Sequence, residues 1–271
     1  MSRSVPSDQA QGLRRLFAHS RVRFVPVVAN PHVAFGGMML ERLATGFAER
    51  GVHTLVVDAS DRAPAPSEMA LVDLAACVEP LSSHVSYLAA RGLPLRFVDS
   101  AGSTHAFLQA VAEALPSGRV VLVHAHATDC CRLFARPART GDAEPVCPLL
   151  LADDRPASVT QAYASMKLLV MRAGLKVHDL LLGAAARSAR AERIAVQLAL
   201  CADDFLGAVL RDWVRVDPAG DALEATSPSL RRWVDERLPG RDTVLSMVEA
   251  AHAMSSIAAG SRFAAENWAF N

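Results

Sequence analysis

The strongest constraint on the fold lies in residues 22–60, where a strand is followed by a loop, a helix and a second strand. The pattern predicts an apolar strand at 22–29, a bend at 30–35, a helix at 38–50 and a β-branched strand at 52–59. Gly36 and Gly37 precede the helix, and Gly51 ends it. Because parallel strands need a crossover connection such as a helix, this arrangement favours a parallel pair.

The same alternation of strands and helices continues to about residue 218. Further strands are expected at 95–98, 119–124, 147–152, 177–183 and 209–216. The helices are expected at 67–77, 83–91, 104–115, 128–135, 158–172 and 189–206. Strands that are apolar throughout are typical of parallel sheets, which are buried on both faces. We therefore predict an α/β protein with a doubly wound, mostly parallel sheet and helices on both faces.

Three parts are predicted along the chain. Residues 1–20 hold a short amphipathic helix at 7–18, and residues 21–218 form the α/β domain. Residues 219–271 form a helical extension, with helices at 227–238 and 242–259. The polar positions of the last helix include few basic residues, which favours a packing or partner helix over a membrane anchor.

Composition excludes several classes of function. The 271 residues have a formal net charge of zero and no long basic block, so no nucleic-acid partner is expected. The five cysteines are odd in number and scattered, and the first residues carry no apolar signal segment. Reduced thiols in the cytoplasm are the expectation. No apolar run approaches the length of about twenty residues that a membrane-spanning helix needs.

The loop at 30–35 lacks the groups that hold a nucleotide phosphate. Loops that do so between a strand and a helix use several glycines, a lysine and a Ser or Thr for Mg²⁺. Here Pro31 has no N–H, and Val33 and Phe35 put side chains where an anion needs close backbone approach. The first lysine of the chain is Lys167. The loop is therefore predicted to be a turn kept for folding, with at most a weak attraction for anions at the start of the helix.

Two groups of polar residues follow predicted strands and could carry chemistry. Asp58 ends the second strand, where doubly wound folds place ligand-binding groups. His124 and His126 follow a buried strand, with Cys130 and Cys131 close behind. His-x-His followed by adjacent cysteines is not a familiar zinc spacing, so no metal site is predicted.

A pair of carboxylates, Asp153 and Asp154, closes the strand at 147–152. Paired carboxylates can serve acid–base chemistry or bind Mg²⁺. The residues up to Ser158 also fit a turn and a helix cap, and this is the interpretation we prefer.

The succession at 25–60 resembles the MinD/ParA class of deviant P-loop ATPases, and residues 156–164 are similar to a segment of that class that reads Pro-x-x-Ser-x-x-Asp-Ala-Tyr. More specific is the amino-terminal segment Asp8-Gln9-Ala10-Gln11-Gly12-Leu13-Arg14. It resembles the Asp-Gln-Ala-x-x-Leu-Arg segment of the FlhG family, MinD-like regulators of flagellar number and placement. In that family the segment contacts FlhF, a signal-recognition-type GTPase, and stimulates its GTP hydrolysis. The resemblance covers about residues 7–218.

The chain departs from the family at the phosphate loop. When the two are aligned backward from residues 49–51, the family's two lysines fall on Pro31 and Gly36. Its Mg²⁺-binding Thr falls on Gly37. The loop has thus lost the cationic groups and the metal ligand together.

Further departures lie at the ends of predicted strands. His124 stands in place of an acidic residue, and Gly183 in place of the Asn that reads the base. The family has a pair of acidic residues at the end of the second strand. This chain keeps the first as Asp58 and has Ser60 in place of the second. Gly36 and Gly37, with Asp58 and His124, then mark the remnant of a nucleotide site. Since charge and positioning provide nearly all of phosphoryl-transfer catalysis, the resemblance implies a pseudo-ATPase without a cofactor.

The function implied by the resemblance is non-catalytic regulation through the amino-terminal helix, which would act on an FlhF-like GTPase. Gln9 and Arg14 would make polar contacts to the active centre of the partner, and Ala10 and Leu13 would pack against it, with Asp8 in the same set. Flagellar basal-body proteins are further candidate partners.

Three alternatives stay open. The amino-terminal helix could instead close the edge of its own sheet. The altered loop could bind a nucleotide or another anion in an enzyme that uses Asp58, His124 and His126 as acid–base groups. The protein could also be a scaffold dimer. Because MinD-like dimers form around ATP, a chain without ATP should be monomeric or associate through another surface, such as the carboxyl-terminal helix.

Overall fold

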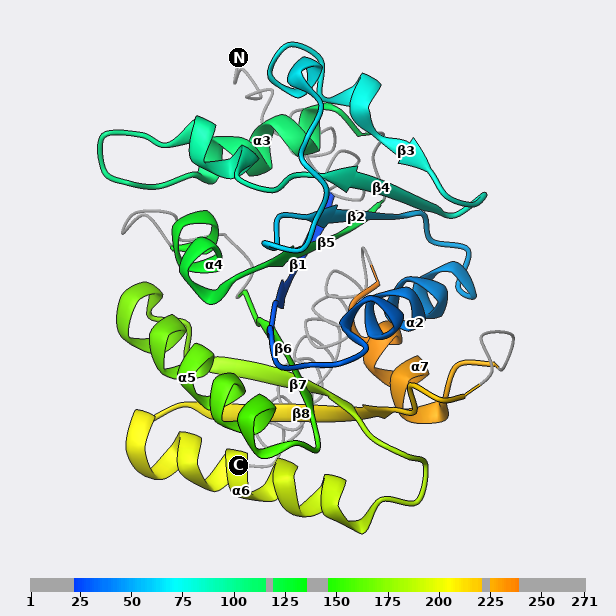
Figure 1. Ribbon diagram of the computed structural model, residues 1–271, viewed down its shortest axis with the longest axis vertical. Coiled ribbons are helices and arrows are strands. Elements are labelled where there is room, and N and C mark those ends of the chain that lie inside the picture. The colour runs from blue at the N-terminus through cyan, green and yellow to red at the C-terminus, as the bar shows by residue number, and fades with distance from the viewer. Residues whose placement is uncertain (1–21, 116–118, 136–145, 221–224, 239–271) are drawn as a thin grey trace, which may run out of the picture.

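The computed structural model describes residues 22–115, 119–135, 146–220 and 225–238. These residues form an eight-stranded sheet with the order β3-β4-β2-β5-β1-β6-β7-β8 (Figure 1). Only β3 is antiparallel to its neighbour within this described sheet. The strands are β1 (Arg23–Val28), β2 (Thr54–Asp58), β3 (Glu79–Pro80), β4 (Val85–Ala89), β5 (Val120–Ala125), β6 (Leu149–Asp153), β7 (Val177–Gly183) and β8 (Val209–Val216).

Helices cover both faces of this sheet. Figure 1 shows α2 and α7 on one side and α4, α5 and α6 on the other. The described α-helices are α2 (Gly36–Ala48), α3 (His105–Glu113), α4 (Ala127–Phe134), α5 (Pro156–Ala173), α6 (Ala189–Leu206) and α7 (Pro228–Asp235), and the described 3₁₀ helices are η1 (Glu68–Leu71), η2 (Ala75–Cys77) and η3 (Leu93–Phe97). The predicted doubly wound α/β architecture is confirmed.

The core is divided in two by the sheet. On one side, α2 and α7 bury apolar residues against the strands, and the Phe47 and Trp233 rings meet edge to face with centroids 6.4 Å apart. On the other side, α3 to α6 bury a larger set that includes Phe107, Leu133 and Met166. Every central strand therefore needs apolar side chains on both faces, which explains why β1, β5 and β6 have continuous apolar sequences.

The helix predicted at 83–91 is wrong, because this segment contains strand β4. Its residues pair in parallel with β2, from Val85 beside Thr54 to Ala89 beside Asp58. Ser86 and Leu88 are buried, while Val85, Tyr87 and Ala89, which alternate with them, are half-buried. In so short a segment the apolar spacing does not separate a strand from a helix, and pairing with a neighbouring strand decides the outcome.

The strand predicted at 95–98 is also wrong, since the 3₁₀ helix η3 occupies this stretch. Gly92 precedes η3 with φ of 71°, a left-handed conformation that glycine adopts without a steric cost. Pro94 lies in the first turn, where its fixed φ suits a helix, and is buried with Leu93. The apolar run is too short to indicate a strand beside a Gly and a Pro, which mark a turn.

The α-helix predicted at 67–77 is replaced by the two short helices η1 and η2. The Ser67 side chain accepts a hydrogen bond from the Met69 N–H at the start of η1. Asp73 Oδ1 accepts another from the Ala76 N–H, 3.1 Å away. Such local side-chain contacts offer the backbone an alternative to a continuous helix, and they break this segment into two turns.

Helix α7 is held on the sheet by a buried charge cluster. Asp179 of β7 is fully buried and accepts hydrogen bonds from Trp233 Nε1, Arg211 and Arg237. The Arg237 guanidinium also lies 3.8 Å from the centroid of the Trp233 ring. The described part of the predicted carboxyl-terminal extension therefore packs on the α/β core.

The helices predicted at 7–18 and 242–259 lie outside the described residues. Among the helices that are described, none combines the length and apolar character needed to span a bilayer.

Candidate functional site

The candidate site lies at the carboxyl edge of the sheet, around the loop at 30–35 that joins β1 to α2. Strand β1 pairs with β5 on one side and with β6 on the other. The helices that follow these strands cover opposite faces: α2 follows β1, whereas α4 and α5 follow β5 and β6 (Figure 1). Ligands of doubly wound proteins bind where the chain diverges in this way.

Asn30 anchors the start of this loop to the neighbouring strand and helix. Its Nδ2 donates hydrogen bonds to the carbonyl oxygens of Leu151 and Ser158, both at 2.9 Å. Asn30 is itself buried, so the contacts satisfy an amide that could not reach water. Asn30 thus fixes the loop to β6 and α5.

Three amide groups of the loop, at residues 32–34, are taken by the protein itself. Asn30 Oδ1 accepts from the His32 N–H at 3.0 Å, and the Asn30 carbonyl accepts from the Val33 N–H at 3.1 Å. Asp153 Oδ2 accepts from the Ala34 N–H at 3.2 Å. A phosphate-holding loop needs such N–H groups directed at the ligand. In this protein the Asp153 carboxylate occupies one of these N–H groups, that of Ala34.

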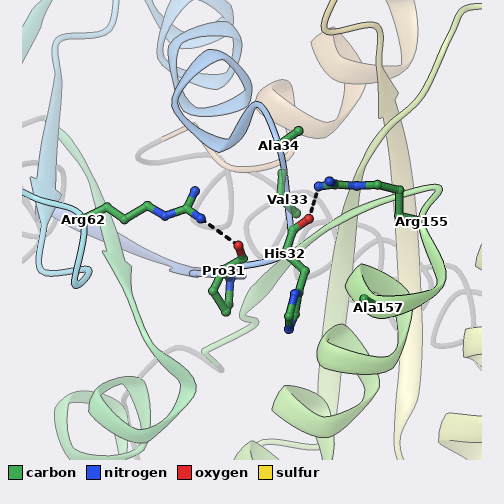
Figure 2. Close-up of a pocket in the computed structure, with 7 residues that line it drawn as sticks. All are labelled: Pro31, His32, Val33, Ala34, Arg62, Arg155 and Ala157. Atoms are coloured by element: carbon green, nitrogen blue, oxygen red, sulfur yellow. Dashed lines mark hydrogen bonds between the residues drawn. The ribbon is translucent and has the colours of Figure 1, made fainter.

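The carbonyl groups of the loop face two arginines. Figure 2 shows Arg62 and Arg155 reaching the loop from opposite sides. Arg62 donates to the Pro31 carbonyl at 2.8 Å, and Arg155 donates to the His32 carbonyl. The His32 ring is directed away from both guanidinium groups (Figure 2). This part of the loop presents hydrogen-bond acceptors, the opposite of what an anion requires.

Asp153 connects the two sides of this arrangement. Its Oδ2 accepts from Arg155 Nη2 at 2.7 Å and from Arg155 Nε at 3.0 Å, in addition to the Ala34 contact. Burial raises the pKa of Asp153, but the hydrogen bonds from Arg155 and Ala34 outweigh it and hold the pKa below its usual range. Asp153 is therefore ionised when it holds the loop.

The predicted turn at Asp153 is present, but the predicted cap is not. Asp153 Oδ1 accepts from the Arg155 N–H at 3.1 Å, and Ser158 Oγ accepts from the Asp153 N–H at 2.9 Å. The N-cap residue of α5 is Arg155, and its side chain makes no capping hydrogen bond to the first turn of the helix.

Asp58 and His124, predicted as remnants of a nucleotide site, are brought together at the ends of β2 and β5. His124 Nδ1 lies 2.9 Å from Asp58 Oδ1. The Tyr87 hydroxyl donates to Asp58 Oδ2 at 3.4 Å, and the Ser60 N–H donates to Oδ1 at 3.1 Å. Burial raises the pKa of Asp58, yet the contacts with His124 and Ser60 lower it overall. The Asp58 carboxylate therefore fixes the orientation of the His124 imidazole ring.

His126 does not join this pair. Its Nε2 lies 2.9 Å from Asp61 Oδ2 without hydrogen-bond geometry. Cys130 and Cys131 are buried in α4, and burial raises the pKa of both thiols. Among the described residues, no three His, Cys, Asp or Glu side chains converge as metal ligands would.

The predicted remnant glycines open α2 without a steric need for glycine. A Cβ atom at Gly37 would meet nothing within 4 Å, and one at Gly36 would meet only Val33 Cγ1 at 3.9 Å. Gly183, which stands in place of the base-reading Asn, is enclosed: a Cβ atom there would lie 3.1 Å from Met39 Sδ. The space for a larger side chain at this strand end is filled by α2.

Sequence reasoning missed the residues that close the loop. The sequence pattern does not single out Asn30, Arg62 or Arg155, and it assigns Asp153 to a turn and helix cap in preference to acid–base chemistry or Mg²⁺ binding. The one available signal was position, since each follows a strand at the edge where ligand-binding groups gather. The amino-terminal segment containing Asp8, Gln9, Ala10, Leu13 and Arg14 lies outside the described residues.

Comparisons with known proteins define the fold. No protein-family model matches the sequence, and no curated protein matches it significantly. A plasmid partition protein from Borrelia burgdorferi shares 8% sequence identity, with a TM-score of 0.50, over 80% of this chain and 99% of that one. An ATP complex of a McdA variant from Cyanothece shares 14% identity, with a TM-score of 0.50, over 79% of this chain and 88% of that one. The MinD cell division protein of Aquifex aeolicus shares 10% identity, with a TM-score of 0.46, over 80% of this chain and 88% of that one.

The two similarities with a TM-score of 0.50 agree with the architecture of the sheet. The chain has the fold of MinD/ParA-type P-loop proteins, as the resemblance in residues 25–60 implied. Fold does not determine activity, which depends on the groups at the site. At that site the loop of this chain is closed by Asp153, Arg62 and Arg155.

Proposed function

We propose that this protein is a cytoplasmic, non-catalytic regulator of the FlhG type, which controls flagellar number and placement by acting on an FlhF-type GTPase. The observation that carries the non-catalytic part is the closed loop at 30–35. Its N–H groups at His32, Val33 and Ala34 are paired within the protein, and its carbonyls at Pro31 and His32 face arginines. ATP would have to break these contacts before it could use the N–H groups of residues 32–34.

The chemistry of the site supports the same proposal. Phosphoryl transfer depends on cations and a metal ion that neutralise the developing charge. Where the family has its two phosphate-binding lysines, this chain has Pro31 and Gly36. Where the family has its metal-binding Thr, this chain has Gly37. The family's base-reading Asn is replaced by Gly183, and the Met39 side chain lies close to where a side chain at this position would start. No single substitution restores this set of groups.

The sequence of the segment at 8–14 supports the proposal that the partner is an FlhF-type GTPase. Its match to the Asp-Gln-Ala-x-x-Leu-Arg pattern is confined to a few residues and lies ahead of β1, at the position the FlhG resemblance requires. We assign Gln9 and Arg14 to polar contacts with the active centre of the GTPase, and Ala10 and Leu13 to packing against it. Basal-body proteins are further partners that this function would require.

The test uses the full chain and a synthetic peptide of residues 1–20 with the FlhF-type GTPase of the same organism. Both should bind the GTPase and raise its GTP turnover, by about tenfold or more if Arg14 stabilises charge in the active centre. Arg14→Ala and Gln9→Ala should remove most of the stimulation, whereas Arg15→Ala, one position away, should keep it. A chain and peptide that neither bind nor accelerate the GTPase would refute the proposal.

A second candidate is an enzyme or anion-binding protein that uses the remodelled site. The observation that favours it is the pair of His124 and Asp58, 2.9 Å apart at a strand end, which resembles an imidazole oriented for acid–base work. Thermal unfolding with ATP, ADP and GTP separates the candidates, because a ligand that binds the folded state raises the midpoint temperature. A rise of several degrees with a nucleotide would favour the second candidate.

A further inference from the structure

Helix α6 has one face that no other described element covers. Figure 1 shows α6 at one end of the molecule, beyond α5 and β8. Its inner face is buried through Ile194, Leu198 and Ala202. On the outer face Val196 and Leu200 are 53% and 58% exposed. Residues with this spacing are neighbours on a helix surface, so two large apolar side chains lie together in the middle of an open face.

The charged residues around this apolar pair are divided by sign along the helix. Basic residues stand in its first half and acidic residues near its end: Arg190, Arg193, Asp203 and Asp204. Glu192, in the first turn, is the one charged residue of α6 that departs from this division. The four side chains that follow the division are exposed, and none of them forms an ion pair within the described part of the chain.

This division is the reverse of what a single helix favours. The amino end of a helix carries a partial positive charge and the carboxyl end a partial negative one. Arg190 lies in the first turn of α6, whereas Asp203 and Asp204 lie in the last turn, where no basic residue offsets them. The charges therefore oppose the dipole of their own helix, and a partner with the opposite polarity would stabilise them.

An antiparallel copy of the same helix has that polarity. Arg193, Leu200 and Asp204 lie on one line of the helix surface, because Leu200 follows Arg193 by roughly two turns and Asp204 follows it by roughly three. In a pair related by a twofold axis, this line meets the same line of the other copy in the reverse direction. Arg193 of each copy then faces Asp204 of the other, and Val196 and Leu200 pack between the two ion pairs.

We propose that this face of α6 is the interface of a homodimer, in which two copies of the chain pack α6 against α6 in antiparallel orientation. The interface contains no residue of the loop at 30–35 and requires no nucleotide. It is also independent of the GTPase partner proposed above. One helix face per copy is small beside the roughly 800 Å² per partner of a standard stable interface, so we expect a Kd of roughly 10 μM.

The test is sedimentation velocity of the full chain without nucleotide, at concentrations from about 1 to 100 μM. The mass should rise over this range from that of one chain to that of two. Leu200→Gln should weaken the dimer by about tenfold or more, because it removes an apolar contact at the centre of the interface. Phe205→Gln is the matched control and should leave the Kd unchanged, since Phe205 is exposed but lies on another side of α6.

Exchanging two charges tests the antiparallel arrangement. Arg193→Glu and Asp204→Arg should each weaken the dimer by about tenfold or more, since each places like charges opposite one another. The double variant Arg193→Glu, Asp204→Arg should restore the Kd to within about threefold of wild type. The two residues are roughly 16 Å apart along the helix, which is too far to pair within one copy, so a restored Kd reports contact between copies.

Three results would overturn the proposal. The first is a full chain that stays monomeric at about 100 μM, which would leave the face to a different partner. The second is a loss of affinity in Phe205→Gln as large as that in Leu200→Gln. The third is a double charge variant that dimerises no better than the single ones.

Discussion

At the scale of single residues, Asp153 connects the loop at 30–35 to Arg155 and to the turn before α5. It supplies an anion to the Ala34 N–H, forms an ion pair with Arg155, and orders the turn that leads into α5. A carboxylate that accepts several hydrogen bonds is stabilised in its charged form. One side chain therefore joins the loop at 30–35 to β6.

Replacing Asp153 should loosen the loop and destabilise the protein. We expect Asp153→Asn to lower the free energy of unfolding by about 1–3 kcal/mol, since it removes charge-assisted hydrogen bonds at a buried position. Asp154→Asn, at the less buried neighbouring carboxylate, is the matched control and should change the free energy by about 0.5 kcal/mol or less. Urea unfolding of the two variants measures this difference, and equal stability would contradict the role of Asp153.

His178 of β7 gives the fold a dependence on pH. Its side chain is fully buried, and neither ring nitrogen has a partner in hydrogen-bond geometry among the described residues. Burial lowers the pKa of His178 to about 4, although the nearby backbone of Leu175 offsets part of the shift. Because the unfolded chain takes up this proton near pH 6.5, stability is complete above that pH and falls as the pH drops toward 4.

The loss assigned to His178 amounts to about 3 kcal/mol between pH 6.5 and 4. His178→Leu should flatten the pH dependence in this window, because a neutral side chain takes up no proton. His105→Gln, at an exposed histidine, should leave the slope as in wild type. Urea midpoints at several pH values measure the slopes, and a wild-type slope in His178→Leu would show that another group is responsible.

At the scale of elements, the attachment of α7 depends on the buried cluster around Asp179. Arg237 is 5% exposed and contacts both Asp179 and the Trp233 ring. Arg211 contacts Asp179 from β8. Removing one partner of a buried ion pair is costly because the remaining charge cannot reach water.

Arg237→Met should therefore lower the free energy of unfolding by about 3 kcal/mol. The double variant Asp179→Asn, Arg237→Met should lose less than the sum of the two single variants, because the unpaired carboxylate is gone. Glu236→Gln, on the exposed neighbour, should stay within about 0.5 kcal/mol of wild type. Unfolding in urea, followed by tryptophan fluorescence, tests this, and a loss below about 0.5 kcal/mol for Arg237→Met would contradict it.

The elements also show what the sequence could predict. Strands β1, β5 and β7 and the long helices α5 and α6 were predicted because each has a sustained apolar pattern with a clear end, such as Gly174 after α5. The failures cluster at residues 67–98, where segments are short. There β4 depends on its pairing with β2, a contact between residues distant in the chain.

The same reason limits prediction of the site. That the loop is a poor phosphate cradle could be read from Pro31, Val33 and Phe35 alone. That it is closed could not, because Ala34 and Asp153 are 119 residues apart in the chain. Arg62 and Arg155 carry no local pattern that distinguishes them from other surface arginines. Their role arises from the strand order, which brings the ends of β2, β1 and β6 to one edge.

At the scale of the whole molecule, the closed loop determines how the protein should respond to nucleotides. We expect Mg²⁺-ATP to leave both the midpoint of thermal unfolding and the molar mass from light scattering unchanged. The expectation rests on the proposed function: the N–H groups of residues 32–34 are paired within the protein, and a dimer of the MinD type would need ATP bound at this loop. A doubling of the mass on addition of ATP would contradict this expectation, and a change in midpoint without a change in mass would indicate binding that is not coupled to association.

The contact between Ala34 and Asp153 has one more consequence, which concerns concentration. A bound nucleotide occupies its site to a degree that follows its level in the cell. A carboxylate on the same chain meets its partner at an effective concentration that the fold sets and that no metabolite pool alters. If Asp153 takes the place of a ligand, each molecule carries that ligand from the moment it folds. The output of the protein then depends on how many copies are made and degraded, and not on the energy state of the cell.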